Sequence, residues 1–391
     1  MACLGCASAP LQADLTPFEP MDTVDTAHIF VMVNPTSGGN KAGEILNLKL
    51  DFYRLNDKTW VWMFNMMDSE SRSAGFDKLR TFQKDPRAHP SIIACGGDGT
   101  VKWVVSELER VECLDIPIGV IPFGTGNDFA RVCGWGGFAP KPLIGKQMRS
   151  FNKTMNNLLN SQTCKFDVWK IEILLKNNGE FWEIKNKREE LCSSETKEKI
   201  MVHQMINYFS IGADANIAFE FAKNRKRTQL GNKLEYVRQG LKQLVNAPPK
   251  LRSYIEKIQS NETELPAKLG RKFLVWQNIG SYGGGMDIWG KNKSSRGMVP
   301  QQFGDELLEL MSVISPAYVP ASKFSGRAGI RKVSQQDNYS ITFKDSWDQS
   351  VYFQVDGEGY RANGIRAISI SRDYQVQVLR KGGKNQVSMS L

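Results

Sequence analysis

Glycine, hydroxyl and carboxylate residues stand together at three places in the first third of the chain. Residues 96–100 read Gly-Gly-Asp-Gly-Thr, and residues 124–128 read Gly-Thr-Gly-Asn-Asp. A third segment of similar character consists of Asn34, Pro35, Thr36, Ser37 and Gly38. Glycine lets the backbone approach a ligand closely, so that several amides can converge on one anion, and the threonines add hydroxyl donors. These three segments are typical of loops that bind phosphate.

Two carboxylates, Asp98 and Asp128, lie inside these loops. An acid beside phosphate oxygens is unfavourable unless a divalent cation lies between them. Glycines and acids together therefore indicate a magnesium–nucleotide complex and phosphoryl transfer. Either acid could instead be only a helix N-terminal cap, and one glycine-rich loop alone is more often a tight turn. The sequence has no GxxxxGK[ST] motif and no GxGxxG on its first strand, which argues against a P-loop enzyme and a dinucleotide dehydrogenase.

Apolar runs place these loops in a fold. Four of them occupy residues 28–33, 60–66, 91–95 and 116–122, separated by segments of helical character. Such an alternation predicts a parallel sheet with both faces covered. Ligands bind beyond the carboxyl ends of its strands, where the first, third and fourth runs lead into the loops. We therefore predict a doubly wound α/β domain at residues 27–162, after a disordered tail at residues 1–26.

The rest of the chain has a different pattern. Short β-rich segments are separated by turn signals such as Asn177-Asn178-Gly179 and Asn363-Gly364, as in an antiparallel β-sandwich. One helix is predicted at residues 231–245, with Leu234, Val237, Leu241 and Leu244 on its apolar face. We predict a mainly antiparallel β-sandwich domain at residues 163–391, with the site in the cleft between the two domains.

A second carboxylate pair, Asp356 and Glu358, occurs in the sequence VDGEG. An alcohol becomes a good nucleophile only when a base takes its proton, and a positioned carboxylate is the usual acceptor. Two residues apart on a continuing strand, both side chains would point to one face. The alternative is an acidic hairpin turn without chemistry, because Asp-Gly strongly favours such turns.

Several of these segments resemble a known family. The motifs VNPTSGG, ACGGDGTVKWVVSEL and GVIPFGTGNDFAR resemble the catalytic domain of diacylglycerol kinases, and INYFSIGADANIAFEF, NIGSYGGGMDIWG, GDELLELMSV and FQVDGEG resemble its accessory domain. The resemblance extends from Ile29 to Leu379. It implies a lipid kinase that uses ATP and Mg²⁺ to convert 1,2-diacylglycerol into phosphatidic acid. Sphingoid or ceramide kinases and NAD kinases, which use the same or an altered glycine motif, remain alternatives.

The resemblance also implies roles for individual residues. The nucleotide would be bound by Asn34, Pro35, Thr36, Ser37, Gly38, Gly97, Asp98, Gly99, Thr100, Thr125 and Asn127. Glu358 would be the general base and Asp98 a further catalytic carboxylate, and the expected metal ligands are Asp128, Asp305 and Asp356. Glu306 follows Asp305 where the family usually has glycine, which puts that metal site in question. Gly359 replaces a usual proline, which is expected to loosen its turn.

Charge and cysteine content suggest the partners and the compartment. A net charge of +10 indicates an anionic partner. The basic stretches 223–227 and 310–336, the latter with Lys323, Arg327, Arg331 and Lys332 and no acid, predict peripheral contact with diacylglycerol in anionic membranes. The tryptophans lie in apolar strands rather than among cations, which argues against nucleic acid as a partner.

No apolar run reaches the roughly 18 to 20 residues of a membrane span, and the N-terminus has no secretory pattern. The seven scattered cysteines fit reduced thiols in a cytoplasmic protein and cannot form the cysteine-rich zinc modules of many animal relatives. A minimal enzyme without these modules is therefore expected. Cys3 and Cys6 could carry palmitoyl groups, although an unmodified tail is the favoured prediction.

Overall fold

The computed structural model describes residues 25–192, 199–224, 231, 235, 238, 249–267, 269–290, 297–320 and 329–382. Several predictions lie outside the described residues. They are the tail up to residue 24 with Cys3 and Cys6, the apolar face of the predicted helix at 231–245, most of the basic stretch 223–227, and Lys323 and Arg327.

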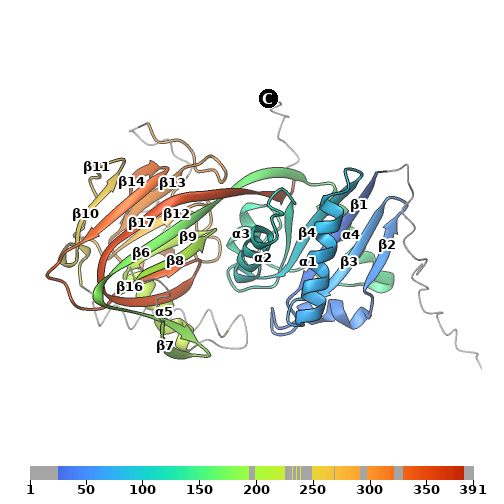
Figure 1. The fold of residues 1–391 in the computed structure, drawn as a ribbon, viewed down its shortest axis with the longest axis horizontal. Helices are drawn as coiled ribbons and strands as arrows, with labels where there is room; N and C mark the ends of the chain where they lie inside the picture. Colours follow the sequence, from blue (N-terminus) through green and yellow to red (C-terminus); the bar gives the residue numbers. More distant parts are fainter. Residues whose placement is uncertain are drawn as a thin grey trace, which may run out of the picture.

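The first part of the chain is an α/β sheet, drawn at the right of Figure 1. Its strands are β1 (Thr26–Val33), β2 (Phe52–Asn56), β3 (Thr59–Asn65), β4 (Ala88–Gly96) and β5 (Ile118–Pro122). They lie in the order β2-β3-β1-β4-β5, and all neighbours are parallel except β2 and β3. The predicted parallel strands are confirmed, whereas β2 lies where the sequence predicted a segment of helical character.

Helices cover both faces of this sheet. Along β1, Phe30 faces α1 (Ser69–Gln83) and α2 (Asp98–Arg110) in one apolar cluster. The next residue, Val31, faces η1 (Ala42–Leu48) and α4 (Arg149–Leu159) in another. Because successive side chains of a strand point to opposite faces, a strand covered on both sides is apolar throughout. This explains the continuous apolar runs in the sequence.

The second part of the chain is an antiparallel β-sandwich built on two long strands, β6 (Gln162–Lys185) and β17 (Glu358–Arg380). One layer adds β8 (Ile200–Met205), β15 (Asn338–Phe343), β10 (Ile255–Ser260) and β11 (Thr263–Glu264). The other adds β7 (Arg188–Cys192), β16 (Val351–Val355), β9 (Tyr208–Gly212), β12 (Phe273–Gln277), β13 (Leu308–Val313) and β14 (Ile330–Gln336). The predicted fold class, α/β followed by an antiparallel β-sandwich, is confirmed.

Bulges allow β6 and β17 to take part in both layers of the sandwich. Their pairing changes register between Asn363 and Ile365 and again between Ile365 and Ala367. Such irregularities bend a strand, so that its two halves can belong to different layers. The layers enclose one apolar core that contains Trp169, Trp276 and Phe353. Among the described residues, no helix has both the length and the apolar character needed to cross a membrane.

The last residues of β17 return to the first sheet, as Figure 1 shows. Val378 pairs in parallel with Ile118 of β5. Trp135 Nε1 donates to the Leu379 carbonyl oxygen at 2.7 Å, and the Lys381 amide donates to the Cys133 carbonyl oxygen at 2.9 Å. The predicted division at residues 162 and 163 therefore assigns to the second domain a strand whose end lies on the first sheet.

Candidate active site

The three glycine-rich loops meet at the carboxyl ends of β1, β4 and β5. Asn34 Nδ2 donates to Thr100 Oγ1 at 3.3 Å, which joins the first loop to the second. Gly97 and Gly124 lie backbone to backbone, because a Cβ added at Gly97 would be 2.8 Å from Gly124 Cα. Glycine is required at this contact for packing. The structure thus brings together the loops that the sequence predicted to bind nucleotide.

Gly99 differs from its neighbours. A Cβ added there would have no atom within 4 Å, and Gly99 is not among the residues with positive φ. The fold therefore has no need of a glycine at this position. Gly99 lies in the first turn of α2, where backbone amides lack intrahelical partners and attract anions. A phosphate that approaches this backbone closely would account for a glycine there.

Asp98 caps a neighbouring helix. Its Oδ1 accepts from the Phe129 amide at 2.9 Å and its Oδ2 from the Asp128 amide at 3.1 Å, both at the start of α3 (Asp128–Val132). The side chain of Asn207 also hydrogen-bonds this carboxylate. Burial and the nearby Asp128 carboxylate raise the pKa of Asp98. Asp98 is therefore a helix cap, as the alternative prediction held. It caps α3 from the first residue of α2 and does not cap its own helix.

Asp128 is only 1% exposed, and donors from the second part of the chain surround it. Its carboxylate accepts from the amides of Gly284, at 2.9 and 3.0 Å, and Gly285, at 3.0 Å. It also accepts from Ser281 Oγ at 2.5 Å and Tyr208 Oη at 3.2 Å. In this conformation Asp128 binds the loop after β5 to residues 281–285. A metal ion would have to displace these donors.

Asp356 and Gly357 form the turn between β16 and β17. Their φ angles are 53° and 85°, and Val355 pairs with Glu358 across the turn. Positive φ at both central residues is typical of the tight hairpin turn that Asp-Gly favours. The expectation that Asp356 and Glu358 share one face of a continuing strand is therefore wrong, because Asp356 lies in the turn and Glu358 begins the returning strand.

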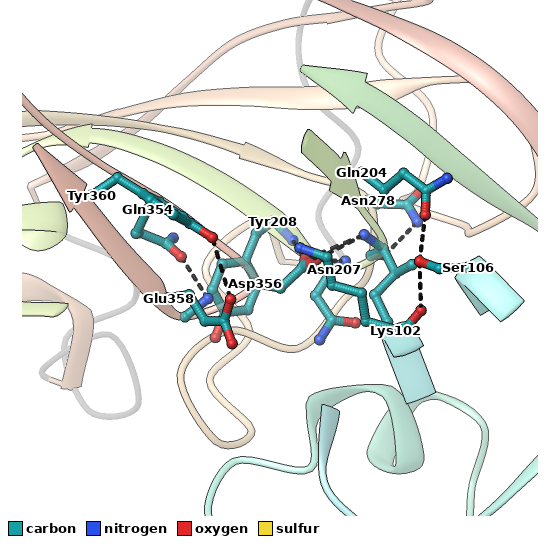
Figure 2. Close-up of polar contacts among 12 residues, drawn as sticks. Lys102, Ser106, Gln204, Asn207, Tyr208, Asn278, Gln354, Asp356, Glu358 and Tyr360 are labelled. Atoms are coloured by element: carbon teal, nitrogen blue, oxygen red, sulfur yellow. Dashed lines mark hydrogen bonds and ion pairs between the residues drawn. The ribbon is translucent and has the colours of Figure 1, made fainter. Parts of the chain in front are cut away.

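The Asp356 carboxylate connects this turn to two other elements (Figure 2). It accepts from the backbone amides of Asn207 at 2.7 Å, Ile206 at 3.1 Å and Tyr208 at 3.2 Å. Lys102 Nζ, from α2, lies 3.2 Å from Asp356 Oδ2, and the Asp356 side chain is 2% exposed. A carboxylate held by three amides and an ammonium group does not suit a metal ion. The geometry therefore argues against the predicted metal role of Asp356.

Glu358 has the most accessible carboxylate of this group. Its side chain is exposed, and among the described residues it accepts one hydrogen bond, from Tyr360 Oη at 3.2 Å. Burial, followed by the Glu358 charge, raises the pKa of Tyr360, so its hydroxyl stays protonated even in alkaline solution. Figure 2 shows Glu358 at the end of the hairpin, with Asp356 between it and Lys102. Such a carboxylate can accept a proton from a bound alcohol.

Gly359 has a packing role that the sequence did not indicate. A Cβ at this position would lie 2.2 Å from the Phe219 amide nitrogen in α5 (Ala213–Lys223). The glycine therefore lets α5 lie directly against the start of β17. The expectation that Gly359 loosens the turn is not supported, because this backbone is closely packed.

Asp305 lies in a different environment, near Asp167 and Glu306. Burial, and to a smaller extent the Asp167 charge, raises the pKa of Asp305 to about 6. Glu306 adopts a φ of 67°, which explains why glycine is usual at this position, and it pairs with Arg372 at 2.5 Å. Within the described residues no group of three or more His, Cys, Asp or Glu side chains is arranged to hold a metal. The metal role of Asp305 remains a prediction.

Of these carboxylates, Asp98 fits a nucleotide-bound magnesium ion best. Mg²⁺ is usually held by one or two carboxylates together with substrate phosphates. Asp98 accepts one backbone amide at each oxygen and a further hydrogen bond from the Asn207 side chain, and it directly precedes Gly99, where an added Cβ would meet no atom within 4 Å. A cation at Asp98 would therefore depend on phosphate oxygens to complete its coordination.

Sequence reasoning assigned no role to Asn207, Tyr208, Ser281 or Gly284, and it placed Lys102 only within the segment Gly97 to Trp103 that the resemblance implies for nucleotide binding. These residues donate to Asp98, Asp128 or Asp356, most of them across more than 140 positions of sequence. Their segments, INYF and SYGGG, were noted as motifs, but neither composition nor spacing indicates which distant acid they contact. The one available signal was that a buried acid needs donors.

Comparisons with known proteins give consistent matches. Residues 28–171 match the diacylglycerol kinase catalytic domain, and residues 204–359 match the diacylglycerol kinase accessory domain. The eye-specific diacylglycerol kinase of Drosophila melanogaster is 27% identical over 385 residues, which cover 95% of this chain and 24% of that protein. Human diacylglycerol kinase theta is 29% identical over 368 residues, which cover 91% of this chain and 35% of that protein. The chain thus spans well under half of the length of these relatives.

A crystal structure of a putative diacylglycerol kinase from Bacillus anthracis str. Sterne is also similar. It is 16% identical, has a TM-score of 0.49, and the match covers 93% of this chain and 98% of that one.

Proposed function

The chain, which carries both characteristic domains, belongs to the diacylglycerol kinase family, and from this premise we propose that it transfers the γ-phosphoryl group of ATP to the free hydroxyl of 1,2-diacylglycerol, giving phosphatidic acid. One observation carries the proposal. The three glycine-rich loops converge around Asp98, and they leave the backbone of Gly99 open at the start of α2.

The loops would hold the nucleotide phosphates through backbone amides and through the hydroxyls of Ser37, Thr100 and Thr125. Magnesium, when bound, neutralises charge that develops on the phosphate oxygens. Asp98 is the residue that would hold the ion beside the phosphates. Asp128 and Asp356 act differently, since their hydrogen bonds connect the two parts of the chain.

Glu358 would act on the acceptor alcohol. As the alcohol oxygen forms its bond to the γ-phosphorus, the bond between that phosphorus and the bridging oxygen of ADP breaks, and the hydroxyl proton passes to Glu358. The Tyr360 hydroxyl holds one oxygen of Glu358 and leaves the other available. Phosphatidic acid and ADP are then the products.

The acceptor is a lipid, so we propose peripheral contact with an anionic membrane in the cytoplasm. Of the predicted basic stretch, Arg331 and Lys332 lie on β14, where Lys332 Nζ is 4.3 Å from the centre of the Trp289 ring. Cationic side chains near an anionic surface contribute about 1 kcal/mol each. The contribution of this strand is best measured as the dependence of activity on anionic lipid.

The deciding experiment is ³²P transfer from labelled ATP, with Mg²⁺, to a panel of acceptors in mixed micelles. We expect label in phosphatidic acid and not in ceramide 1-phosphate, sphingosine 1-phosphate or NADP. Preferential labelling of ceramide or sphingosine would replace the proposal with a sphingoid or ceramide kinase, and labelling of NAD with an NAD kinase. Absence of transfer to every acceptor, from folded protein that binds ATP, would contradict the proposal.

A further inference from the structure

A buried aspartate in the second part of the chain, Asp214, is not used by the function proposed above. It belongs to the motif GADANIAFEF and is only 4% exposed. Its Oδ2 accepts from Ser210 Oγ at 3.0 Å and from the Tyr282 hydroxyl. A buried carboxylate costs free energy unless hydrogen-bond donors surround it, so these donors are held at defined positions. Asp214 thus joins β9, which contains Ser210, to the segment around Tyr282.

The turn from β9 into α5 fixes the position of Asp214. Gly212, between the two elements, adopts a φ of 111°, and a Cβ there would lie 2.4 Å from the Lys272 carbonyl oxygen. Glycine is therefore required for this change of direction. Because α5 begins at the next residue, Asp214 lies in its first turn, where the helix N-terminus stabilises a negative charge. The carboxylate thereby faces Ser210, four positions earlier in the chain.

The two segments that Asp214 joins are also the segments that hold Asp128. On β9, Tyr208 Oη donates to the Asp128 carboxylate at 3.2 Å. Tyr282 and Met286 exchange two backbone hydrogen bonds, of 2.9 and 3.0 Å, and so close the loop whose glycine amides donate to Asp128. The rings of Tyr208 and Tyr282 pack together, with their centres 4.5 Å apart. Asp214 therefore fixes the donors of Asp128 in both segments.

The helix that carries Asp214 also contacts the strand that carries Glu358. A Cβ at Gly359 would lie 2.2 Å from the Phe219 amide nitrogen, so α5 lies directly against the residue that follows Glu358. One helix thus connects the proposed base to the groups that hold Asp128.

We propose that Asp214 is a positioning residue for phosphoryl transfer. It fixes Ser210 and Tyr282, and through them it sets where Glu358 lies relative to Asp128 and the glycine-rich loops. The nucleotide would be held by loops of the other sheet, so loss of Asp214 should leave ATP binding intact. Misplacement of a reacting group by about 1 Å can lower the rate about 100-fold. This inference rests on the proposed function, because it concerns the base of that reaction.

The test separates a positioning role from a purely structural one. Initial rates of ³²P transfer to diacylglycerol, with ATP varied, give kcat and KM for the full chain as wild type, Asp214→Ala, Asp214→Asn and Tyr282→Phe. Tyr282→Phe removes only a hydroxyl, so it tests the contact even if Asp214→Ala does not fold. Tyr53→Phe is the matched control, because Tyr53 is a buried tyrosine of the first sheet whose hydroxyl donates to Asn152 Oδ1 at 2.9 Å. Circular dichroism shows which variants are folded at the assay temperature.

We expect Asp214→Ala and Tyr282→Phe to lower kcat by about 10- to 100-fold with an unchanged KM for ATP. Asp214→Asn should recover most of the activity, because its amide oxygen can still accept from both hydroxyls. Tyr53→Phe should keep the kcat of the wild type. An unchanged kcat in Tyr282→Phe, or an equal loss of kcat in Tyr53→Phe, would overturn the proposal.

Hydrogen exchange distinguishes failure of this inference from failure of the proposed function, because it needs no turnover. Amides of residues 281–286 should exchange faster in Tyr282→Phe than in the wild type, and at an unchanged rate in Tyr53→Phe. Equal exchange in Tyr282→Phe and the wild type would overturn the inference whatever the acceptor. Transfer by the wild type to another acceptor would replace the proposed function alone, and the kcat ratios would then be measured with that acceptor.

Discussion

At the scale of single residues, three carboxylates near the candidate site differ in their surroundings. Glu358 is exposed and accepts one hydrogen bond, from Tyr360. Asp98 receives two backbone amides and lies beside an open glycine. Asp356 is nearly fully buried against Lys102 and three amides. These surroundings suit a proton acceptor, a ligand of a nucleotide-bound ion and a structural anchor, respectively.

Glu358→Gln is expected to lower kcat by about 10²- to 10⁴-fold, because the amide keeps the shape of the side chain but cannot accept the proton. The KM for ATP should stay unchanged, since the glycine-rich loops belong to the other sheet. The control is Glu262→Gln, an exposed glutamate in the turn between β10 and β11, which should behave as wild type. Loss of ATP binding, or an unchanged kcat, would place the base elsewhere.

Asp356→Asn is expected to lower the free energy of unfolding by on the order of 3 kcal/mol, because it leaves the Lys102 ammonium without its buried partner. Asparagine tolerates the positive φ of this turn, so the variant tests charge rather than backbone strain. Chemical denaturation of Asp356→Asn, Lys102→Met and the double variant gives the coupling energy. If the two single effects simply add, the pair does not connect α2 to the hairpin.

At the scale of elements, the glycine-rich loops contain glycines of two kinds. Gly97 is needed for contact with Gly124, whereas a Cβ added at Gly99 would meet no atom within 4 Å. The first kind serves packing between the loops after β4 and β5. The second kind leaves space where a ligand can approach the backbone.

Gly97→Ala and Gly99→Ala should therefore have different effects on the melting temperature. Their effects on the KM for ATP should have the same direction. The first should lower the melting temperature, because its Cβ would lie 2.8 Å from the Gly124 backbone. The second should leave the melting temperature unchanged or higher, since alanine favours a helix over glycine by about 0.5 to 1 kcal/mol. Both should raise the KM for ATP. If Gly99→Ala leaves that KM unchanged, no phosphate lies against Gly99.

The strand β13 contains a buried acid, Glu309. Its titration should make the free energy of unfolding depend on pH. Gln301 Nε2 donates to Glu309 Oε2 at 2.8 Å, Gln335 Nε2 donates to Oε1 at 2.9 Å, and burial raises the Glu309 pKa to about 8. The unfolded chain releases this proton near pH 4.5, whereas the folded chain keeps it to about pH 8. The contribution of Glu309 to stability is therefore fully present below pH 4.5 and is lost as pH rises through about 8.

Glu309→Gln removes this titration. Relative to the variant, the wild type should lose a few kcal/mol of unfolding free energy between pH 4.5 and pH 8. Urea denaturation across this range measures the difference, and the exposed Glu256→Gln on β10 serves as the control. A difference between wild type and Glu309→Gln that does not change with pH would mean that Glu309 titrates normally.

At the scale of the whole molecule, β6 and β17 join the two parts of the chain more closely than a linker would. β17 supplies Ile368 to the sandwich core, Val378 to the core beneath α1 and α2, and Leu379 to the core beneath η1 and α4. One strand therefore contributes to apolar clusters in both parts of the chain. Loss of either sheet would expose apolar side chains of the other.

We therefore expect the chain to unfold in one cooperative transition. Differential scanning calorimetry should give a single peak, with equal calorimetric and van't Hoff enthalpies. Val378→Ala is expected to lower the temperature of that one peak rather than split it. Two separated peaks would instead support independent domains at residues 27–162 and 163–391.

The sequence by itself was sufficient for the features that depend on local pattern. Apolar runs predicted β1, β3, β4 and β5, and glycines after three of them predicted where the loops would meet, because parallel strands bring their carboxyl ends to one edge. The dipeptide Asp356-Gly357 allowed a hairpin turn as an alternative prediction. The motifs of both domains were sufficient to identify the family. These features are periodic or depend on few residues, so they can be recognised along the chain.

Only the tertiary structure decided which partners each acid has. Asp128 lies against Gly284, Asp356 against Lys102, and Val378 beside Ile118, although 156, 254 and 260 positions separate them along the chain. No spacing rule connects residues so far apart, because their contact depends on how two whole sheets pack. For the same reason, the sequence could not show that two of the three predicted metal ligands have other partners in the fold, Asp128 backbone amides and Asp356 amides and a lysine.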